Sequence, residues 1–87
     1  MFKYEFLLIL KDEDSYQLIK DKYFKKFNIE VEKEDLWGVR KFAYPIKKQD
    51  SGYYIVLNIN VKDEKIPNLM KELELEDNVL RSLLFVN

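Results

Sequence analysis

Residues 53–61 read YYIVLNINV, and this stretch decides the fold class of the chain. One side of it carries only apolar side chains, namely Tyr53, Ile55, Leu57, Ile59 and Val61. The other side carries Tyr54, Val56, Asn58 and Asn60. Alternation with a period of two is typical of a β-strand that buries one face. We therefore predict a strand here and a sheet built around it.

Three further extended segments are predicted on either side of this strand. Residues 2–10 place Phe2, Tyr4, Phe6, Leu8 and Leu10 on one face. Residues 29–31 and 39–46 look extended, with a possible bulge at Gly38 between them. Pro45 has no backbone N–H to donate to a neighbouring strand, which favours a position at the edge of the sheet. Residues 47–52 are predicted to turn, and residues 79–86 to form the last strand.

Two amphipathic helices are predicted between these strands. The first follows the acidic start at residues 12–15, and its apolar face consists of Tyr16, Ile19, Tyr23 and Phe27. Asn28 is a plausible left-handed terminator for it. The second is expected to be capped by Asp63 and to have Pro67 in its first turn. Its apolar face consists of Ile66, Leu69, Met70 and Leu73.

The element order is therefore strand, helix, strand, strand, helix, strand. With right-handed crossovers, this βαββαβ order gives an α+β, ferredoxin-like split βαβ sandwich. We expect a four-stranded antiparallel sheet with two helices on one face, formed by residues 1–87 as a single domain. The opposite face of the sheet is left open.

Composition narrows the possible functions. The 87 residues include no cysteine and no histidine, which argues against disulfides, thiol nucleophiles, Cys/His zinc sites and the commonest general base. Neither glycine lies in a phosphate-binding loop pattern. We therefore expect no enzyme, no metal and no cofactor. Acylphosphatase-like enzymes share this fold. This sequence has no arginine-containing glycine loop near the first turn that would support such an activity.

Membrane association is not expected either. The longest apolar run is FLLIL at residues 6–10, far shorter than the roughly 20 residues that cross a bilayer. The first five residues lack the apolar core of a signal peptide. A soluble, cytoplasmic protein is the default expectation.

One segment is basic although the net charge of the chain is -1. Residues 39–48 contain Arg40, Lys41, Lys47 and Lys48 and no acid, interleaved with aromatic residues that include Phe42 and Tyr44. Such a mixture suits phosphate contacts and base stacking. The alternative is that the aromatic side chains face the core and the cations are merely solvated.

The open sheet face is the second candidate surface. By strand alternation it should display Leu7, Ile9, Tyr54 and Val56 beside Lys3, Asn58 and Asn60. An apolar patch on a small domain often marks a partner surface, although a dimer or a covering loop would explain it equally well. RNA recognition motifs share this element order, but Ile55 stands where their second outward aromatic residue is expected.

Residues 37–46, WGVRKFAYPI, closely resemble the central signature of the S-six family of bacterial ribosomal proteins. That signature runs Trp or Leu, Gly, any residue, Arg, Arg, Leu, Ala, Tyr, Pro, Ile. Other matching positions are Lys3-Tyr4-Glu5, residues 31–33, Gly52-Tyr53-Tyr54, Leu73, Asp77, Asn78, Val79 and Arg81. The resemblance extends over nearly the whole chain.

This resemblance implies a structural component of the small ribosomal subunit, located on a cytoplasmic or organellar ribosome. Its partners would be the central domain of small-subunit ribosomal RNA and the S-eighteen ribosomal protein, with no small-molecule substrate and no membrane. Matching positions indicate RNA-binding residues, namely Lys3, Arg40, Lys41, Tyr44 and Arg81. Strand alternation indicates Leu7, Tyr54 and Val56 for the partner surface. The alternative is a stand-alone regulatory, dimerisation or RNA-recognition module on the same fold.

Overall fold

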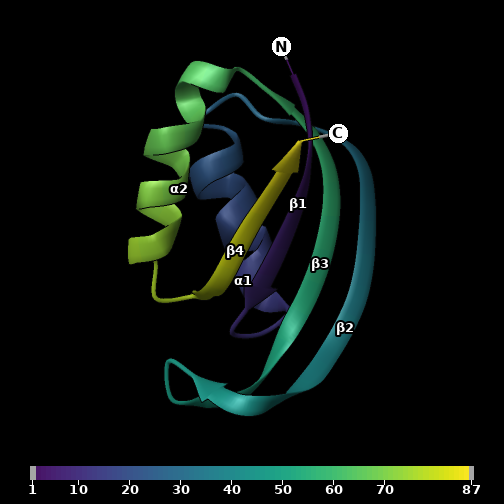
Figure 1. Ribbon diagram of the computed structural model, residues 1–87, viewed down its shortest axis with the longest axis vertical. Coiled ribbons are helices and arrows are strands. Elements are labelled where there is room, and N and C mark those ends of the chain that lie inside the picture. Colours follow the sequence, from purple (N-terminus) through teal and green to yellow (C-terminus); the bar gives the residue numbers. More distant parts are fainter. Residues whose placement is uncertain (1, 87) are drawn as a thin grey trace.

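The structure, a computed structural model, describes residues 2–86 and contains one four-stranded antiparallel sheet (Figure 1). The spatial order of the strands is β2-β3-β1-β4. The elements in chain order are β1 (Phe2–Leu10), α1 (Asp14–Ile19), the π-helical η1 (Lys20–Phe24), β2 (Glu30–Ile46), β3 (Gln49–Val61), the 3-10 turn η2 (Asp63–Lys65), α2 (Ile66–Leu75) and β4 (Val79–Val86). This confirms the predicted βαββαβ fold.

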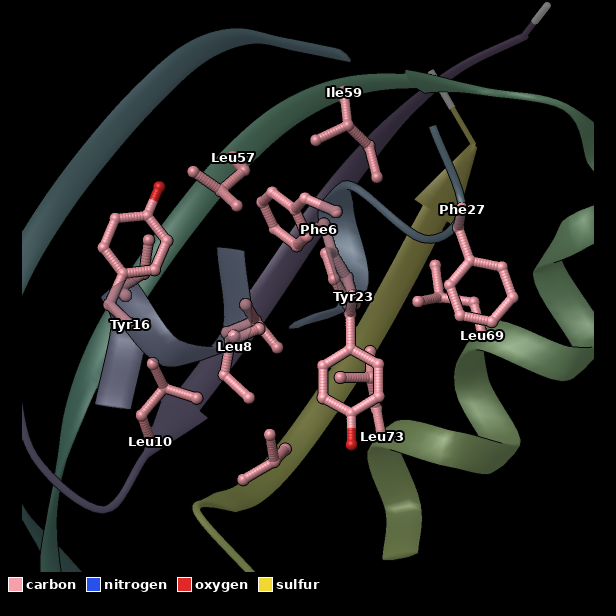
Figure 2. Close-up of a cluster of buried hydrophobic side chains, with 14 of the residues drawn as sticks. Phe6, Leu8, Leu10, Tyr16, Tyr23, Phe27, Leu57, Ile59, Leu69 and Leu73 are labelled. Carbon is pink, nitrogen blue, oxygen red and sulfur yellow. The ribbon is translucent and has the colours of Figure 1, made fainter. Parts of the chain in front are cut away.

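The core lies between the sheet and the two helices, which pack on the same face (Figures 1 and 2). The predicted inward residues of β3 are buried, as are those of β1 from Tyr4 to Leu10, while the Phe2 side chain lies outside the described part. Phe6, Leu8, Ile55 and Leu57 are completely buried. The helices contribute Tyr16, Ile19, Tyr23, Phe27, Leu69 and Leu73, as their spacing predicted. Alternation along the strands and helical spacing therefore identified the core correctly.

The first helix is less regular than predicted. It is a short α-helix that continues into the π-helical turn η1, yet the same apolar side chains remain buried. The Asp12 carboxylate accepts hydrogen bonds from both the backbone N–H and the hydroxyl of Ser15, at 2.9 and 2.7 Å, so the acidic start does cap the helix. Asn28 has φ +55° and so adopts the left-handed conformation that was predicted to terminate the helix.

Two expectations about local structure were wrong. The segments predicted at residues 29–31 and 39–46 are parts of one continuous strand, because the ladder with β3 supplies hydrogen bonds to the charged stretch between them. Asp63 does not cap α2, since it lies in η2 and its carboxylate instead accepts a hydrogen bond from the Tyr4 hydroxyl. The bulge near Gly38, the edge position of Pro45 and the first-turn position of Pro67 are confirmed.

The predicted turn at residues 47–52 is also narrower than expected. Ile46 pairs with Gln49, so only Lys47 and Lys48 form the turn, and β3 begins four residues before Tyr53. The long β2–β3 hairpin that results extends beyond the end of β1 and bends towards the start of β4 (Figure 1). This bend shapes the candidate site.

Candidate RNA and partner interface

The sheet face opposite the helices has an apolar centre. In the strand register Leu7 lies between Val56 of β3 and Leu83 of β4. All three side chains are half-buried, which leaves apolar surface open to solvent across three strands. We call these three residues the apolar row. Two of its members, Leu7 and Val56, were predicted for a partner surface.

An aromatic cluster lies beside the apolar row. Tyr54 is parallel to Trp37, with ring centroids 6.5 Å apart, and tilted against Phe42 at 6.1 Å. The extra residue of the β2 bulge is Trp37, because Leu36 pairs with Ile55 and Gly38 with Tyr54. The bulge thus places the indole ring next to the Tyr54 ring. Tyr54, the third predicted partner residue, belongs to this cluster.

The hairpin covers part of the face that was expected to be open. A Cβ atom at Gly52 would lie 2.7 Å from Phe42 Cζ and 2.8 Å from Ile9 Cγ2, so only glycine allows this packing. Ile9 is consequently only 5% exposed, and the expectation that it lies on the open surface was wrong. The Lys47 ammonium donates a 2.8 Å hydrogen bond to the carbonyl of Val79 and so ties the hairpin to the start of β4.

The bend forms a shallow, open hollow of about 300 Å³ on the side of the aromatic cluster. Its lining consists of Lys41, Phe42, Ala43, Tyr44, Ile46, Tyr54 and Arg81. We call this the cationic hollow, because two cations and no carboxylate line it. Its electrostatics therefore favour an anion, and its rings favour a flat partner.

The structure brings some of the predicted RNA-binding residues together and separates others. Lys41, Tyr44 and Arg81 share the cationic hollow. Arg40 is exposed opposite Gly52 and donates to the carbonyl of its neighbour Val39. Lys3 lies at the far end of the sheet, opposite Asn60, with its ammonium 3.8 Å from the Glu32 carboxylate.

Some lysines on the helix side have partners within the chain. Lys22 lies 2.9 Å from the Glu76 carboxylate, and Lys26 lies 2.7 Å from that of Glu72. Lys65 donates to the carbonyl of Phe27 at 3.0 Å. Residues 2–86 hold no cluster of acidic residues that could bind a metal ion, and none of their helices is long and apolar enough to cross a membrane. The sheet side is therefore the better candidate interface.

A sequence profile of the family described as Ribosomal protein S6 matches residues 3–86. The chain belongs to this family. The small ribosomal subunit protein bS6 of Corynebacterium urealyticum is 39% identical over 88 residues, which cover 94% of this chain and 93% of the relative. The bS6 protein of Dictyoglomus turgidum is 32% identical over 90 residues, covering 97% and 93%.

The fold of the S6-family chain also matches a solved structure. The 30S ribosomal protein S6 of Thermotoga maritima superposes with a TM-score of 0.80 over 99% of this chain and 87% of that one. At 22% identity this match concerns the fold alone. Membership in the S6 family makes the chain a structural ribosomal protein and not an enzyme, as the sequence predicted.

Sequence reasoning missed two residues of the S6-family sheet face. Leu83 and Phe85 lie opposite Leu7 and Glu5 in the register, and Phe85 is 53% exposed. Both share the alternation of Arg81, which is exposed and was already predicted to bind RNA. That alternation was the signal from which they could have been found.

Proposed function

We propose that the protein is a structural constituent of the small ribosomal subunit that binds the central domain of small-subunit ribosomal RNA together with the S-eighteen ribosomal protein. RNA phosphates would be contacted by the basic residues of the hairpin and β4. The partner protein would cover the apolar row. Base-specific readout is not part of this proposal.

One observation carries the proposal: an acid-free cationic hollow lies beside an uncovered apolar row on the same side of the sheet. The local charge is positive there even though the chain as a whole carries -1. Phosphate contacts depend on such local charge rather than on the net charge. The relatives named small ribosomal subunit protein bS6 support the assignment to that subunit.

Sedimentation of a cell lysate through a sucrose gradient, with an antibody to this chain, tests the assignment. We expect the chain to co-migrate with the small subunit and to remain there in moderate salt. Migration only at the top of the gradient would reject the ribosomal assignment. Self-association of the free chain in that fraction would favour the alternative, a stand-alone dimerisation module that uses the open sheet face.

The RNA contacts have a separate test. Arg40→Ala and Arg81→Ala should each weaken binding to a central-domain RNA fragment in the presence of the partner. Each should also reduce the slope of log affinity against log salt by about 0.7 to 0.9, because one phosphate contact is lost. Lys71→Ala is the matched control, since Lys71 is an exposed cation on α2, on the helix side. Unchanged affinity in both arginine variants would remove these residues from the interface.

A further inference from the structure

The most exposed aromatic side chain that the structure describes lies at the cationic hollow. Tyr44 is 81% exposed, compared with 47% for Trp37 and 53% for Phe85. Among residues 2–86 it stacks on no other ring and donates no hydrogen bond, so it contributes little to the core. The alternative that this tyrosine serves packing is therefore disfavoured, and its free ring face is available to a ligand.

The two cations of the hollow are also free. Neither Lys41 nor Arg81 lies within 4 Å of a carboxylate in the described part of the chain, unlike Lys3, Lys22, Lys25 and Lys26. Lys41 comes from β2 and Arg81 from β4, which are the opposite edges of the sheet. The bend of the hairpin brings them to one hollow, where their unneutralised charges can hold a single anionic group.

Two further hollows in the described part of the chain lack this combination. One lies between the hairpin tip, α2 and β4, where Glu74 stands beside Lys47 and Arg81. The other lies on the sheet and includes Glu5 and Asp35 beside a single cation, Lys33. A phosphate would meet carboxylates in both of them. Of these three hollows, the cationic hollow is the one that joins unopposed positive charge to exposed aromatic surface.

We infer that the cationic hollow binds one unpaired nucleotide of RNA, whose base stacks on the Tyr44 ring and whose phosphate lies between Lys41 and Arg81. This inference rests on the proposed function and adds the class of ligand. Bases within a duplex are stacked on each other and hide their faces, whereas an unpaired base offers its ring to an aromatic side chain. The ligand is therefore a single-stranded or bulged nucleotide.

The test uses the full chain and three labelled RNA probes, of which the two single strands have equal length and charge. The first is a single-stranded pentanucleotide, the second is the same strand with an abasic central position, and the third is a duplex. Fluorescence anisotropy of the label gives the affinity, and Trp37, the only tryptophan, gives a second signal. We expect the intact strand to bind roughly 5- to 150-fold more tightly than the abasic strand, which is the contribution of one stacked base.

Variants then assign that difference to the hollow. Tyr44→Leu should abolish the preference for the intact strand, whereas Tyr44→Phe should retain it. Lys41→Gln should weaken both single strands equally, because it removes a phosphate contact and leaves the stacking intact. Tyr44 is exposed, so these variants should fold, and urea denaturation checks that they do.

Three outcomes would overturn the inference. Equal affinity for the intact and abasic strands would show that the hollow binds phosphate only. A preference that survives Tyr44→Leu would place the stacking elsewhere. Loss of affinity for the S-eighteen partner in Tyr44→Leu, with RNA binding unchanged, would assign the tyrosine to the protein interface. Retained binding to the central-domain fragment in any of these cases would leave the proposed function standing, whereas its absence would reject both.

Discussion

At the scale of single residues, Gly52 decides whether the hairpin can approach the sheet. An added Cβ atom would meet Phe42 Cζ at 2.7 Å, Ile9 Cγ2 at 2.8 Å and the carbonyl oxygen of Leu10 at 3.1 Å. The first two are side-chain atoms and can shift, but the third belongs to the backbone. Overpacking of this kind costs about 1–3 kcal/mol.

We therefore expect Gly52→Ala to lower the free energy of unfolding by about 1–3 kcal/mol, measured by urea denaturation. Phe42→Leu should relieve part of that loss, because leucine lacks the distal ring atom that the new methyl group would meet. Gly38→Ala is the control, since Gly38 has φ +86° but no neighbour within 4 Å. Its backbone strain should not respond to Phe42→Leu, and equal relief in both backgrounds would contradict the packing explanation.

Glu76 is a second decisive residue, on the helix side. Its carboxylate accepts hydrogen bonds from Lys22 at 2.9 Å, Tyr23 at 2.8 Å and the Asn78 side chain at 2.9 Å. The Lys22 ammonium is the main cause that lowers the pKa of Glu76 to about 2, with the Tyr23 hydroxyl and Asn78 assisting. Between this value and about 4.3, the unfolded chain binds the proton more readily than the folded chain does.

Stability due to Glu76 should therefore be fully present above about pH 5 and lost as the pH falls towards 2. Because Lys22 is exposed and its charge is screened, we expect the loss to be on the order of 1–2 kcal/mol. Glu76→Gln should flatten this part of the stability profile, measured by thermal or urea unfolding from pH 2 to pH 7. Glu13→Gln is the control at an exposed carboxylate. A variant profile parallel to the wild type would refute this role for Glu76.

At the scale of elements, the turn of the β2–β3 hairpin consists of two lysines, a residue type that is strained in this turn. Lys47 has φ +48° and Lys48 has φ +65°, which corresponds to a two-residue turn of the type that favours Asn-Gly. Side chains with a Cβ atom are strained at positive φ. Lys47 compensates through its hydrogen bond to the carbonyl of Val79, whereas Lys48 has no such contact within residues 2–86.

Lys48→Gly should consequently raise the free energy of unfolding by about 0.5–1 kcal/mol, because glycine adopts positive φ without steric cost. The matched control is Lys48→Ala, which removes the charge but keeps the Cβ atom and should show no gain. Urea denaturation of both variants at neutral pH measures the difference. Equal stabilisation by both would attribute the effect to charge instead of backbone strain.

At the scale of the whole molecule, the candidate surfaces gather on one face. On the helix side Lys22 and Lys26 lie near carboxylates, whereas the sheet side combines the cationic hollow with the apolar row. An almost neutral protein can thereby offer an RNA-binding surface without repelling a protein partner nearby. The two proposed interfaces meet at Tyr54, which lines the hollow and neighbours the apolar row.

We expect Leu7→Lys to weaken binding of the purified S-eighteen partner at least tenfold, because a charge would be buried under the partner at the centre of the apolar row. Folding should change by no more than about 1 kcal/mol, since Leu7 is only half-buried. Leu18→Lys, at a side chain on α1 that is 44% exposed, is the control. Isothermal titration calorimetry gives both affinities, and equal values would place the partner elsewhere.

Local patterns predicted most of the fold, because strand alternation and helical spacing report burial directly. They failed at residues 32–38, where β2 is exposed on both faces and so has no alternation between polar and apolar residues. They also failed at Ile9, because Gly52 of the hairpin, which packs beside it, is distant in the sequence. Of the candidate site, each basic residue could be named in advance, but not which of them share a surface.

The sequence by itself determined the element order, the buried side of each strand and helix, and the family signature at residues 37–46. These features depend on the spacing of apolar residues that are close in the sequence. The hydrophobic effect buries such residues whatever the tertiary arrangement of the elements. Only the tertiary structure decided that Lys41 and Arg81, from opposite edges of the sheet, line one hollow while Lys3 lies far from it. That arrangement depends on the bend of the hairpin, which in turn depends on contacts of Gly52 and Lys47 with residues remote in the sequence.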